Sequence, residues 1–282
     1  MAKRVPVERN VESYILGEKL FFPTAKRYAS NRFLKAALTE KLCIYDKTNL
    51  QISGIPSERY INLYSKWGHG GFGVVLTGNI AVDQYHPEAP GNAIIEKSLD
   101  SKARRKALKK TALAIKSEGS LAVVQLTHSG RQCYISVNEH PYSASDVQLQ
   151  GVKFIGGMVN AIKEEVTDGI GLGRPITAEP DLPKKILLNG IQSALASPFE
   201  DDLVGTDFGF GLLAANSQMW QAGELPYEET NGDPCYGIMD ISIPKVVDAY
   251  TPAAKEFLQV LTDAAEKGPV ISVFEYNVES GA

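Results

Sequence analysis

Glycines and an arginine near residue 170 form the segment with the clearest chemical potential. Residues 169–175 read Gly-Ile-Gly-Leu-Gly-Arg-Pro, and a helix is predicted soon after them. Glycines let backbone N–H groups approach a ligand, and a guanidinium can bind a phosphate through two hydrogen bonds. A phosphate site at Gly173 and Arg174 is one interpretation, and a simple turn at the end of a strand is the other. The glycine spacing does not match the G-x-G-x-x-G dinucleotide fingerprint.

Gln125 and the histidines are the other side chains whose types could bind a ligand. Gln125 lies in the apolar run 121–126, where an amide costs free energy unless its hydrogen bonds are satisfied. The edge of a flavin or another heterocycle would satisfy it, and so would a backbone group in the core. His128 follows three residues later, as either a ligand or a structural group. His69, His86 and His140 lie in predicted loops without a paired carboxylate pattern, so nothing marks them as catalytic, and no metal site is predicted.

The composition predicts a globular protein without nucleic-acid or membrane partners. The 282 residues are 44% hydrophobic and 22% charged, and 29 Lys and Arg against 33 Asp and Glu give a net charge of −4, which does not suit a phosphate backbone. Cys43, Cys133 and Cys235 are too few and too widely spaced for a disulfide framework or a zinc site. No apolar run reaches about 18 residues, and no signal segment opens the chain, so we expect a cytoplasmic protein.

Short apolar runs alternate with longer amphipathic ones between residues 31 and 130, a pattern typical of βαβ units and a parallel sheet. Thr39 and Asn79 follow two predicted strands, at the end where α/β barrels place their active sites. We expect strands at 32–38, 72–77, 121–126 and 167–173, helices at 57–67, 101–117, 157–165, 180–188, 205–223 and 243–267, and an edge strand at 270–274.

Four segments match, in order, the motifs of a known family. They are residues 31–39, 76–79, 124–131 and 168–181. Together they resemble the old yellow enzyme family of FMN-dependent NAD(P)H:flavin oxidoreductases, over about residues 16 to 240. The resemblance implies a (β/α)8 barrel with FMN at its C-terminal mouth. It also implies NAD(P)H as the reductant and an electron-poor alkene as the small-molecule substrate.

The resemblance also assigns roles to individual residues. It implies that Ala37 and Thr39 line the isoalloxazine ring, that Gly78 and Asn79 lie beside it, that Gln125 hydrogen-bonds the pyrimidine edge, and that Gly173 and Arg174 hold the phosphate.

The chain departs from the family after the third strand. The family's substrate-binding His pair, its proton-donor Tyr and its flavin-facing Arg have no counterpart, so no catalytic residue is predicted. Four βα units, about 120 residues, are missing between residues 131 and 157. The retained strands correspond to strands 8-1-2-3 of the barrel. They would leave two open sheet edges through which chains could self-associate.

We therefore predict an α/β fold of the (β/α)8 TIM-barrel type that is incomplete. Residues 1–240 would form the flavin oxidoreductase domain, and residues 241–282 a C-terminal helical tail. The predicted function is FMN-dependent hydride transfer from NAD(P)H to an alkene. One alternative is a non-catalytic or weakly flavin-binding remnant, and another is an unrelated protein that binds a phosphate ligand.

Overall fold

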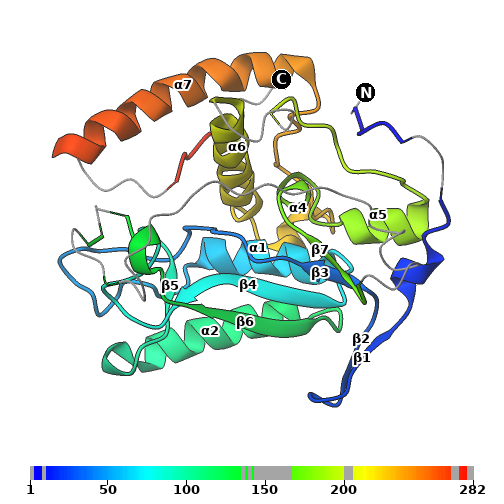
Figure 1. The fold of residues 1–282 in the computed structure, drawn as a ribbon, viewed down its shortest axis with the longest axis horizontal. Helices are drawn as coiled ribbons and strands as arrows, with labels where there is room; N and C mark the ends of the chain where they lie inside the picture. Colours follow the sequence, from blue (N-terminus) through cyan, green and yellow to red (C-terminus); the bar gives the residue numbers. More distant parts are fainter. Residues whose placement is uncertain are drawn as a thin grey trace.

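The computed structural model describes residues 3–7, 11–134, 137–138, 142, 167–199, 206–267 and 273–277 (Figure 1). His140, the expected helix at 157–165 and most of the expected edge strand at 270–274 lie outside these residues.

A parallel sheet forms the centre of the described chain. Four strands lie side by side in the order β7 (Ile170–Leu172), β3 (Phe33–Lys35), β4 (Val74–Ala81) and β6 (Leu121–Thr127), and each adjacent pair is parallel. A short strand, β5 (Ala93–Ile94), pairs with the end of β4. This order is the predicted 8-1-2-3, so the expectation of an incomplete α/β barrel is confirmed.

The helix α1 (Glu58–His69) packs against the sheet for reasons visible in its sequence. Ser57 is its N-cap, and the Ser57 side chain accepts a hydrogen bond from the Tyr60 N–H. Tyr64 and Trp67 recur at helical spacing and are completely buried. They share a core with Phe33 and Val75, which face the helix from β3 and β4.

The helix α2 (Lys102–Ile115) lies beside α1 and begins in the same way, because the Ser101 side chain accepts a hydrogen bond from the Arg104 N–H. The two helices approach closely at Gly68, where an added Cβ would lie 2.3 Å from the Ala114 carbonyl oxygen. Both predicted helices are therefore confirmed.

The remaining elements surround this unit. The antiparallel hairpin β1–β2, which the sequence did not predict, projects from one end of the sheet (Figure 1). A second core joins α6 and α7, with Phe210 and Tyr250 among its buried residues. These elements are β1 (Leu20–Phe22), β2 (Arg27–Ala29), α4 (Pro175–Ala178), α5 (Leu182–Asn189), α6 (Thr206–Ala222), α7 (Pro244–Lys267) and the 3-10 helices η1 (Tyr14–Gly17), η2 (Lys97–Leu99), η3 (Gly130–Gln132) and η4 (Tyr227–Thr230).

The bounds of all four predicted strands differ from the prediction, by one residue in the third, which extends to Thr127, and by more in the others, the fourth being only Ile170–Leu172. The first strand spans Phe33–Lys35; the Ala36 N–H still donates to the Leu172 carbonyl oxygen of β7, and residues 37–38 lie beyond the sheet. The second continues to Ala81, because Ile80 and Ala81 pair with β5 and β6 after a register shift between Leu76 and Asn79. Gly78 and Asn79 therefore lie inside β4 and not beyond its end. The division of the chain at residue 241 stays a prediction.

No helix in the described part of the chain is both long enough and apolar enough to cross a membrane. The three cysteines are all free thiols.

Candidate functional site

Side chains from three segments meet at the carboxyl end of β3 and β4. Glu88 lies in the loop after β4, and its Oε2 atom accepts hydrogen bonds from Thr39 Oγ1 at 3.0 Å and from Asn79 Nδ2 at 2.5 Å. Asn79 Oδ1 in turn accepts from Asn92 Nδ2 at 3.1 Å. Thr39 and Asn79 are each half-buried, so a ligand can still reach this cluster.

Gln125 lies directly across from Asn79 in the register of β4 and β6. Its backbone N–H donates to Thr77 Oγ1 at 3.0 Å, and its side chain is half-buried. Ala37 is also half-buried, in the segment that connects β3 with Thr39. The structure thus brings Thr39, Asn79 and Gln125 to one end of the sheet. Glu88 is part of the same cluster, and no motif in the sequence indicated it.

A buried network supports this end of the sheet from the helix side. Glu40 Oε1 pairs with Lys35 Nζ at 2.9 Å and accepts from the Tyr64 hydroxyl at 2.8 Å. Lys35 Nζ also lies 4.3 Å from the ring centre of Trp67. Burial lowers the pKa of Lys35, and Glu40 partly offsets that effect. Because the two charges are paired with each other, neither is left uncompensated in the core, and removing either partner would be costly.

Gly78 belongs to this internal packing. Its N–H donates to the Tyr64 hydroxyl at 2.7 Å. An added Cβ would lie 1.9 Å from Glu40 Oε2 and 2.1 Å from the Leu38 carbonyl oxygen. The chain itself therefore requires glycine at this position, whether or not a ligand binds.

The glycines at the end of β7 are different. Among the described residues, an added Cβ at Gly173 would meet only Leu38 Cδ2, at 3.9 Å, and one at Gly171 would meet nothing nearer than Ala36 Cβ, at 3.7 Å. The chain does not need glycine there for its own packing, so the space above this backbone is open to a ligand. This opening fits the approach of a ring and a phosphate along the glycine segment.

Arg174 follows these glycines and precedes α4. A Cβ added at Gly211 of α6 would lie 3.2 Å from Arg174 Nη1, so the guanidinium extends along that helix. Asn216, also on α6, donates from Nδ2 to the Thr39 carbonyl oxygen at 3.0 Å. The helix α6 thus connects the Arg174 side of the candidate site with the Thr39 side.

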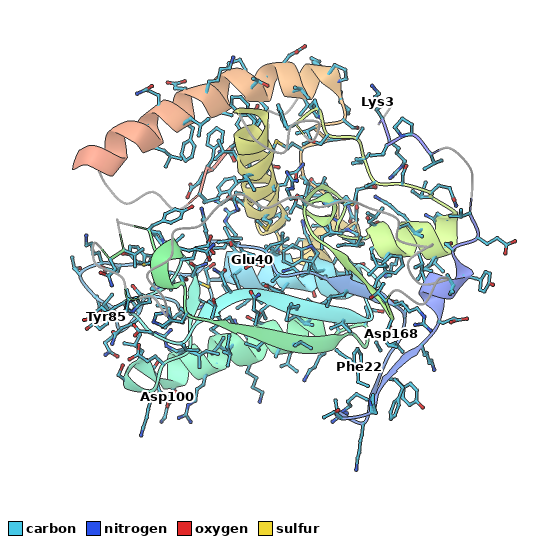
Figure 2. All side chains as sticks on the ribbon, viewed as in Figure 1. Lys3, Phe22, Glu40, Tyr85, Asp100 and Asp168 are labelled. Carbon is cyan, nitrogen blue, oxygen red and sulfur yellow. The ribbon has the colours of Figure 1, made fainter. Side chains whose placement is uncertain are left out.

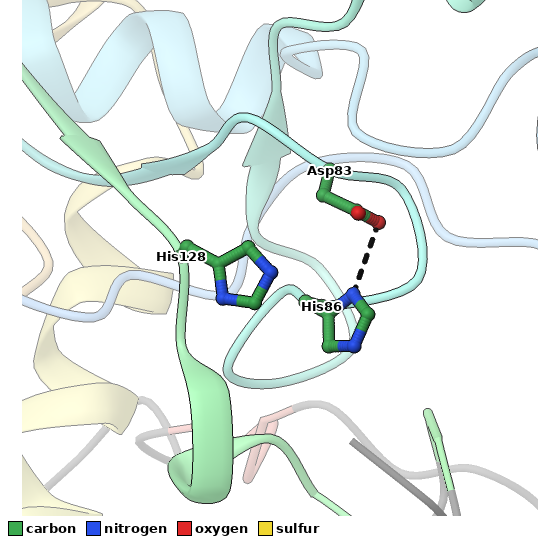
Figure 3. Close-up of side chains that lie close together, drawn as sticks. All are labelled: Asp83, His86 and His128. Atoms are coloured by element: carbon green, nitrogen blue, oxygen red, sulfur yellow. Dashed lines mark ion pairs between the residues drawn. The ribbon is translucent and has the colours of Figure 1, made fainter. Parts of the chain in front are cut away.

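Asp83, His86 and His128 form a cluster beside this site, and their potential ligand atoms lie within 4.8 Å of one another (Figure 3). Asp83 Oδ1 pairs with His86 Nδ1 at 3.2 Å, and the two imidazole rings stack with their centres 4.4 Å apart. Burial raises the pKa of Asp83, but the Tyr85 N–H and His86 outweigh it, so this pKa lies below its usual value. The expectation that His86 has no carboxylate partner was wrong, because Asp83 is only three residues away on a loop whose turn could not be foreseen.

The hydrogen bonds of this cluster do not suit a metal ion. His86 Nε2 accepts from the Tyr142 N–H at 3.0 Å, and His128 Nδ1 accepts from the Gly130 N–H at 3.3 Å. A histidine that ligates a metal instead donates its second ring N–H to an acceptor. The cluster is better explained as a contact between the loop after β4 and the segment after β6.

Comparisons with known proteins point to flavin enzymes. The chain is 42% identical over 135 residues to NADH-dependent flavin oxidoreductase nadA of Aspergillus parasiticus, covering 48% of this chain and 30% of that protein. It is 25% identical over 145 residues to NADH-dependent flavin oxidoreductase iliE of Hypocrea jecorina, covering 51% of this chain and 34% of that protein. The chain thus spans about a third of the length of these relatives. No family model matches it.

Solved structures that resemble the chain include old yellow enzymes. The old yellow enzyme homologue from Zymomonas mobilis matches with 20% identity and a TM-score of 0.39, over 74% of this chain and 60% of that one. The old yellow enzyme from Trypanosoma cruzi matches with 19% identity and a TM-score of 0.37, over 47% of this chain and 32% of that one.

Proposed function

The chain is an old yellow enzyme-like relative of NADH-dependent flavin oxidoreductases, and from this premise we propose that it binds FMN at the carboxyl end of its sheet. One observation carries the proposal. Three segments that the resemblance assigns to the flavin ring converge, since Thr39 after β3 and Asn79 of β4 share Glu88, and Gln125 of β6 lies opposite Asn79. The open backbone at Gly171 and Gly173 gives the same surface room for a ligand.

Each of these residues would have a distinct task. The Gln125 amide carries both donors and an acceptor, as the edge of a heterocycle requires. Arg174 would bind the phosphate through charge-assisted hydrogen bonds. The Glu40 network would hold the β4 backbone in place as the ring binds. Bound FMN would supply hydride transfer from NADH to a small electron-poor alkene.

A second candidate is flavin binding without turnover. The sequence contains no match to the family's substrate-binding His pair or proton-donor Tyr. Without them substrate orientation and general-acid catalysis are lost, and general-acid catalysis alone commonly contributes about 10²- to 10⁴-fold in rate. We propose FMN binding for the chain, and the experiment below measures whether the bound FMN also reduces an alkene. A cytoplasmic location is proposed with it.

The test is a visible absorption spectrum of the purified chain after incubation with excess FMN and removal of free flavin by gel filtration. We expect a bound yellow chromophore that NADH bleaches under anaerobic conditions. Reoxidation of the reduced flavin when an electron-poor alkene is added without oxygen would establish turnover. A reduced flavin that the alkene leaves unchanged and that only oxygen reoxidises would favour the non-catalytic candidate. A colourless protein would contradict FMN binding.

A further inference from the structure

A cavity of about 1020 Å³ opens at the amino-terminal end of the sheet, away from the candidate flavin site. Its lining comes from the hairpin β1–β2, from the first residues of β3, β4 and β6, and from the residues just before β7. Figure 2 places Phe22 and Asp168, which both line it, at one end of the sheet and Tyr85 at the other. The cavity is therefore separate from the surface that we assign to FMN.

The walls of the cavity are apolar because of strand alternation. Val75 faces α1 and is buried in the core, whereas its neighbours Val74 and Leu76, and Leu34 of β3, point to the opposite face of the sheet and line the cavity. These three residues are only half-buried, and Val123 of β6, which is in register with Leu76, is 43% exposed. Apolar side chains lining a cavity of this size favour an aliphatic occupant.

The rim of the cavity is mainly basic. Arg27, Arg32 and Lys116 line it together with one acid, Asp168. Arg32 pairs with Glu18 and donates to the Asp168 carbonyl oxygen, but its buried Nε atom has no hydrogen-bond partner among the described residues. Arg27 and Lys116 take part in none of the ion pairs between described residues. This rim is therefore complementary to an anionic head group, in a chain whose net charge is −4.

We propose that this cavity binds a medium-chain fatty acid. The alkyl chain would lie against Leu34, Leu76 and Val123, and the carboxylate would stay at the opening beside Arg27 and Lys116. A charged head remains at the rim because burying it without partners is costly, whereas each methylene gains from leaving water. The proposal does not depend on flavin binding.

The test is a calorimetric titration of the full chain with octanoate, decanoate and dodecanoate, each below its micelle concentration. We expect one site per chain and about tenfold tighter binding for each pair of added methylenes. Dodecanol should bind about tenfold more weakly than dodecanoate, because it lacks the charge. The double variant R27Q/K116Q should bind dodecanoate no better than dodecanol, and K102Q, at an exposed site on α2, should leave the affinity unchanged.

A second pair of variants tests the walls of the cavity. Val123→Trp should fill the cavity and abolish binding, whereas Val124→Trp, on the neighbouring exposed residue outside the lining, should not. Equal affinity for dodecanol and dodecanoate would overturn the proposal, and so would full binding by R27Q/K116Q. Absence of binding by a chain that sedimentation shows to be dimeric would identify a second copy as the occupant and would also overturn it.

Discussion

Asn79 and Glu88 form a hydrogen bond that connects a strand to the loop that follows it, with Nδ2 donating to Oε2 at 2.5 Å. Thr39, in the segment that follows the neighbouring strand β3, donates to the same oxygen. One carboxylate therefore fixes two side chains of the candidate flavin site before any ligand arrives. Such preorganisation increases affinity, because less conformational freedom is lost on binding.

Replacing Glu88 should affect both stability and ligand binding. Glu88→Ala leaves the Thr39 and Asn79 donors without their acceptor, so we expect a loss of about 1–3 kcal/mol in the free energy of unfolding. We also expect about tenfold weaker FMN binding, measured by quenching of flavin fluorescence. Glu88→Gln keeps an acceptor oxygen and should recover part of both losses.

Glu96 supplies a matched control for this experiment. It accepts hydrogen bonds from the Gln84 backbone and from Ser98, and none from Thr39 or Asn79. Glu96→Ala should lower stability without changing the affinity for FMN. Equal losses of FMN affinity in the two alanine variants would show that Glu88 acts only through overall stability.

Arg174→Ala tests the assignment of the phosphate. A charge-assisted hydrogen bond contributes about 1.5–3 kcal/mol, so the dissociation constant for FMN should rise about tenfold or more. Riboflavin lacks the phosphate, so the substitution should leave its affinity unchanged. A parallel loss of riboflavin affinity would mean that Arg174 supports the fold and does not contact a phosphate.

Two glycines should respond in opposite ways to substitution. Gly173→Val places a side chain in open space, where the nearest atom to the added Cβ is 3.9 Å away, so it should weaken FMN binding with little effect on stability. Gly78→Ala forces a Cβ against Glu40 and the Leu38 carbonyl, so it should destabilise the flavin-free protein. Chemical denaturation with and without FMN would separate the two effects. Unchanged FMN affinity in Gly173→Val would contradict the glycine site.

The contrast between these glycines shows what the sequence could predict. The strand order and helices α1 and α2 follow from apolar periodicity and from the Ser57 and Ser101 caps, which are local signals. Glu88 could not be foreseen, because its role depends on how the loop after β4 returns across the strand ends. Gly78 and Gly173 look alike in sequence, yet only the packed structure shows that Glu40 fills the space at one and that the space at the other stays open.

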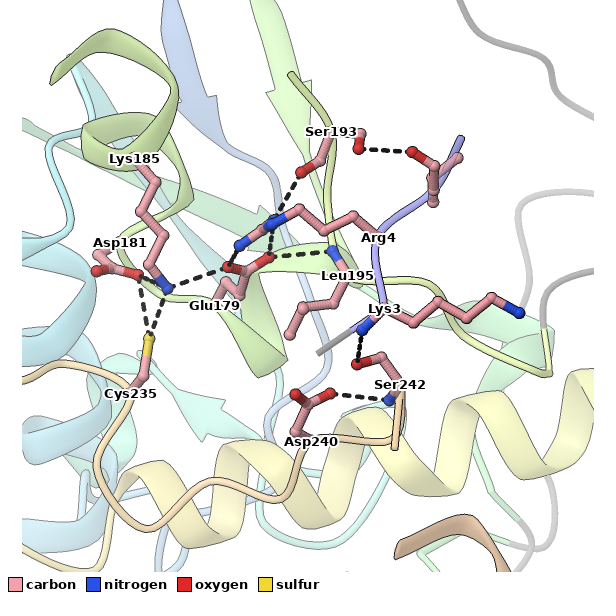
Figure 4. Close-up of polar contacts among 11 residues, drawn as sticks. Lys3, Arg4, Glu179, Asp181, Lys185, Ser193, Leu195, Cys235, Asp240 and Ser242 are labelled. Atoms are coloured by element: carbon pink, nitrogen blue, oxygen red, sulfur yellow. Dashed lines mark hydrogen bonds and ion pairs between the residues drawn. The ribbon is translucent and has the colours of Figure 1, made fainter. Parts of the chain in front are cut away.

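The ion pairs of Glu179 should make stability depend on pH. Glu179 Oε1 pairs with Arg4 at 2.7 Å and with Lys185 at 3.0 Å, and only 2% of its side chain is exposed (Figure 4). Burial raises the pKa of Glu179, but the two cations outweigh it, so this pKa lies below 4.5. The folded state therefore gains stability from the ionised carboxylate above about pH 4.5, and this gain is lost as the pH falls through the lower, folded pKa.

Glu179→Gln should remove that pH dependence. We expect the variant to be about 2 kcal/mol less stable at pH 7, since it leaves Arg4 without its carboxylate partner while Lys185 keeps Asp181. The difference should shrink toward zero at acid pH, as followed by urea denaturation. A difference that stays constant from about pH 7 to about pH 3 would show that packing, and not charge, stabilises this contact.

The outer edge of β6 should promote self-association. This strand pairs with β4 on one side, and no described residue pairs with its other side. Leu126 on this strand is 60% exposed. Lysine on an edge strand opposes pairing with another chain, so Leu126→Lys should lower the average mass measured by sedimentation at high concentration.

Leu113 separates this edge effect from general hydrophobicity, because it is also 60% exposed but lies on α2. Leu113→Lys removes a similar amount of exposed apolar surface without adding charge to a strand edge. If association is driven by backbone pairing along β6, only Leu126→Lys reduces it. If both lysine variants reduce it equally, the contact is a nonspecific apolar one and the open edge of the sheet has no special part in it.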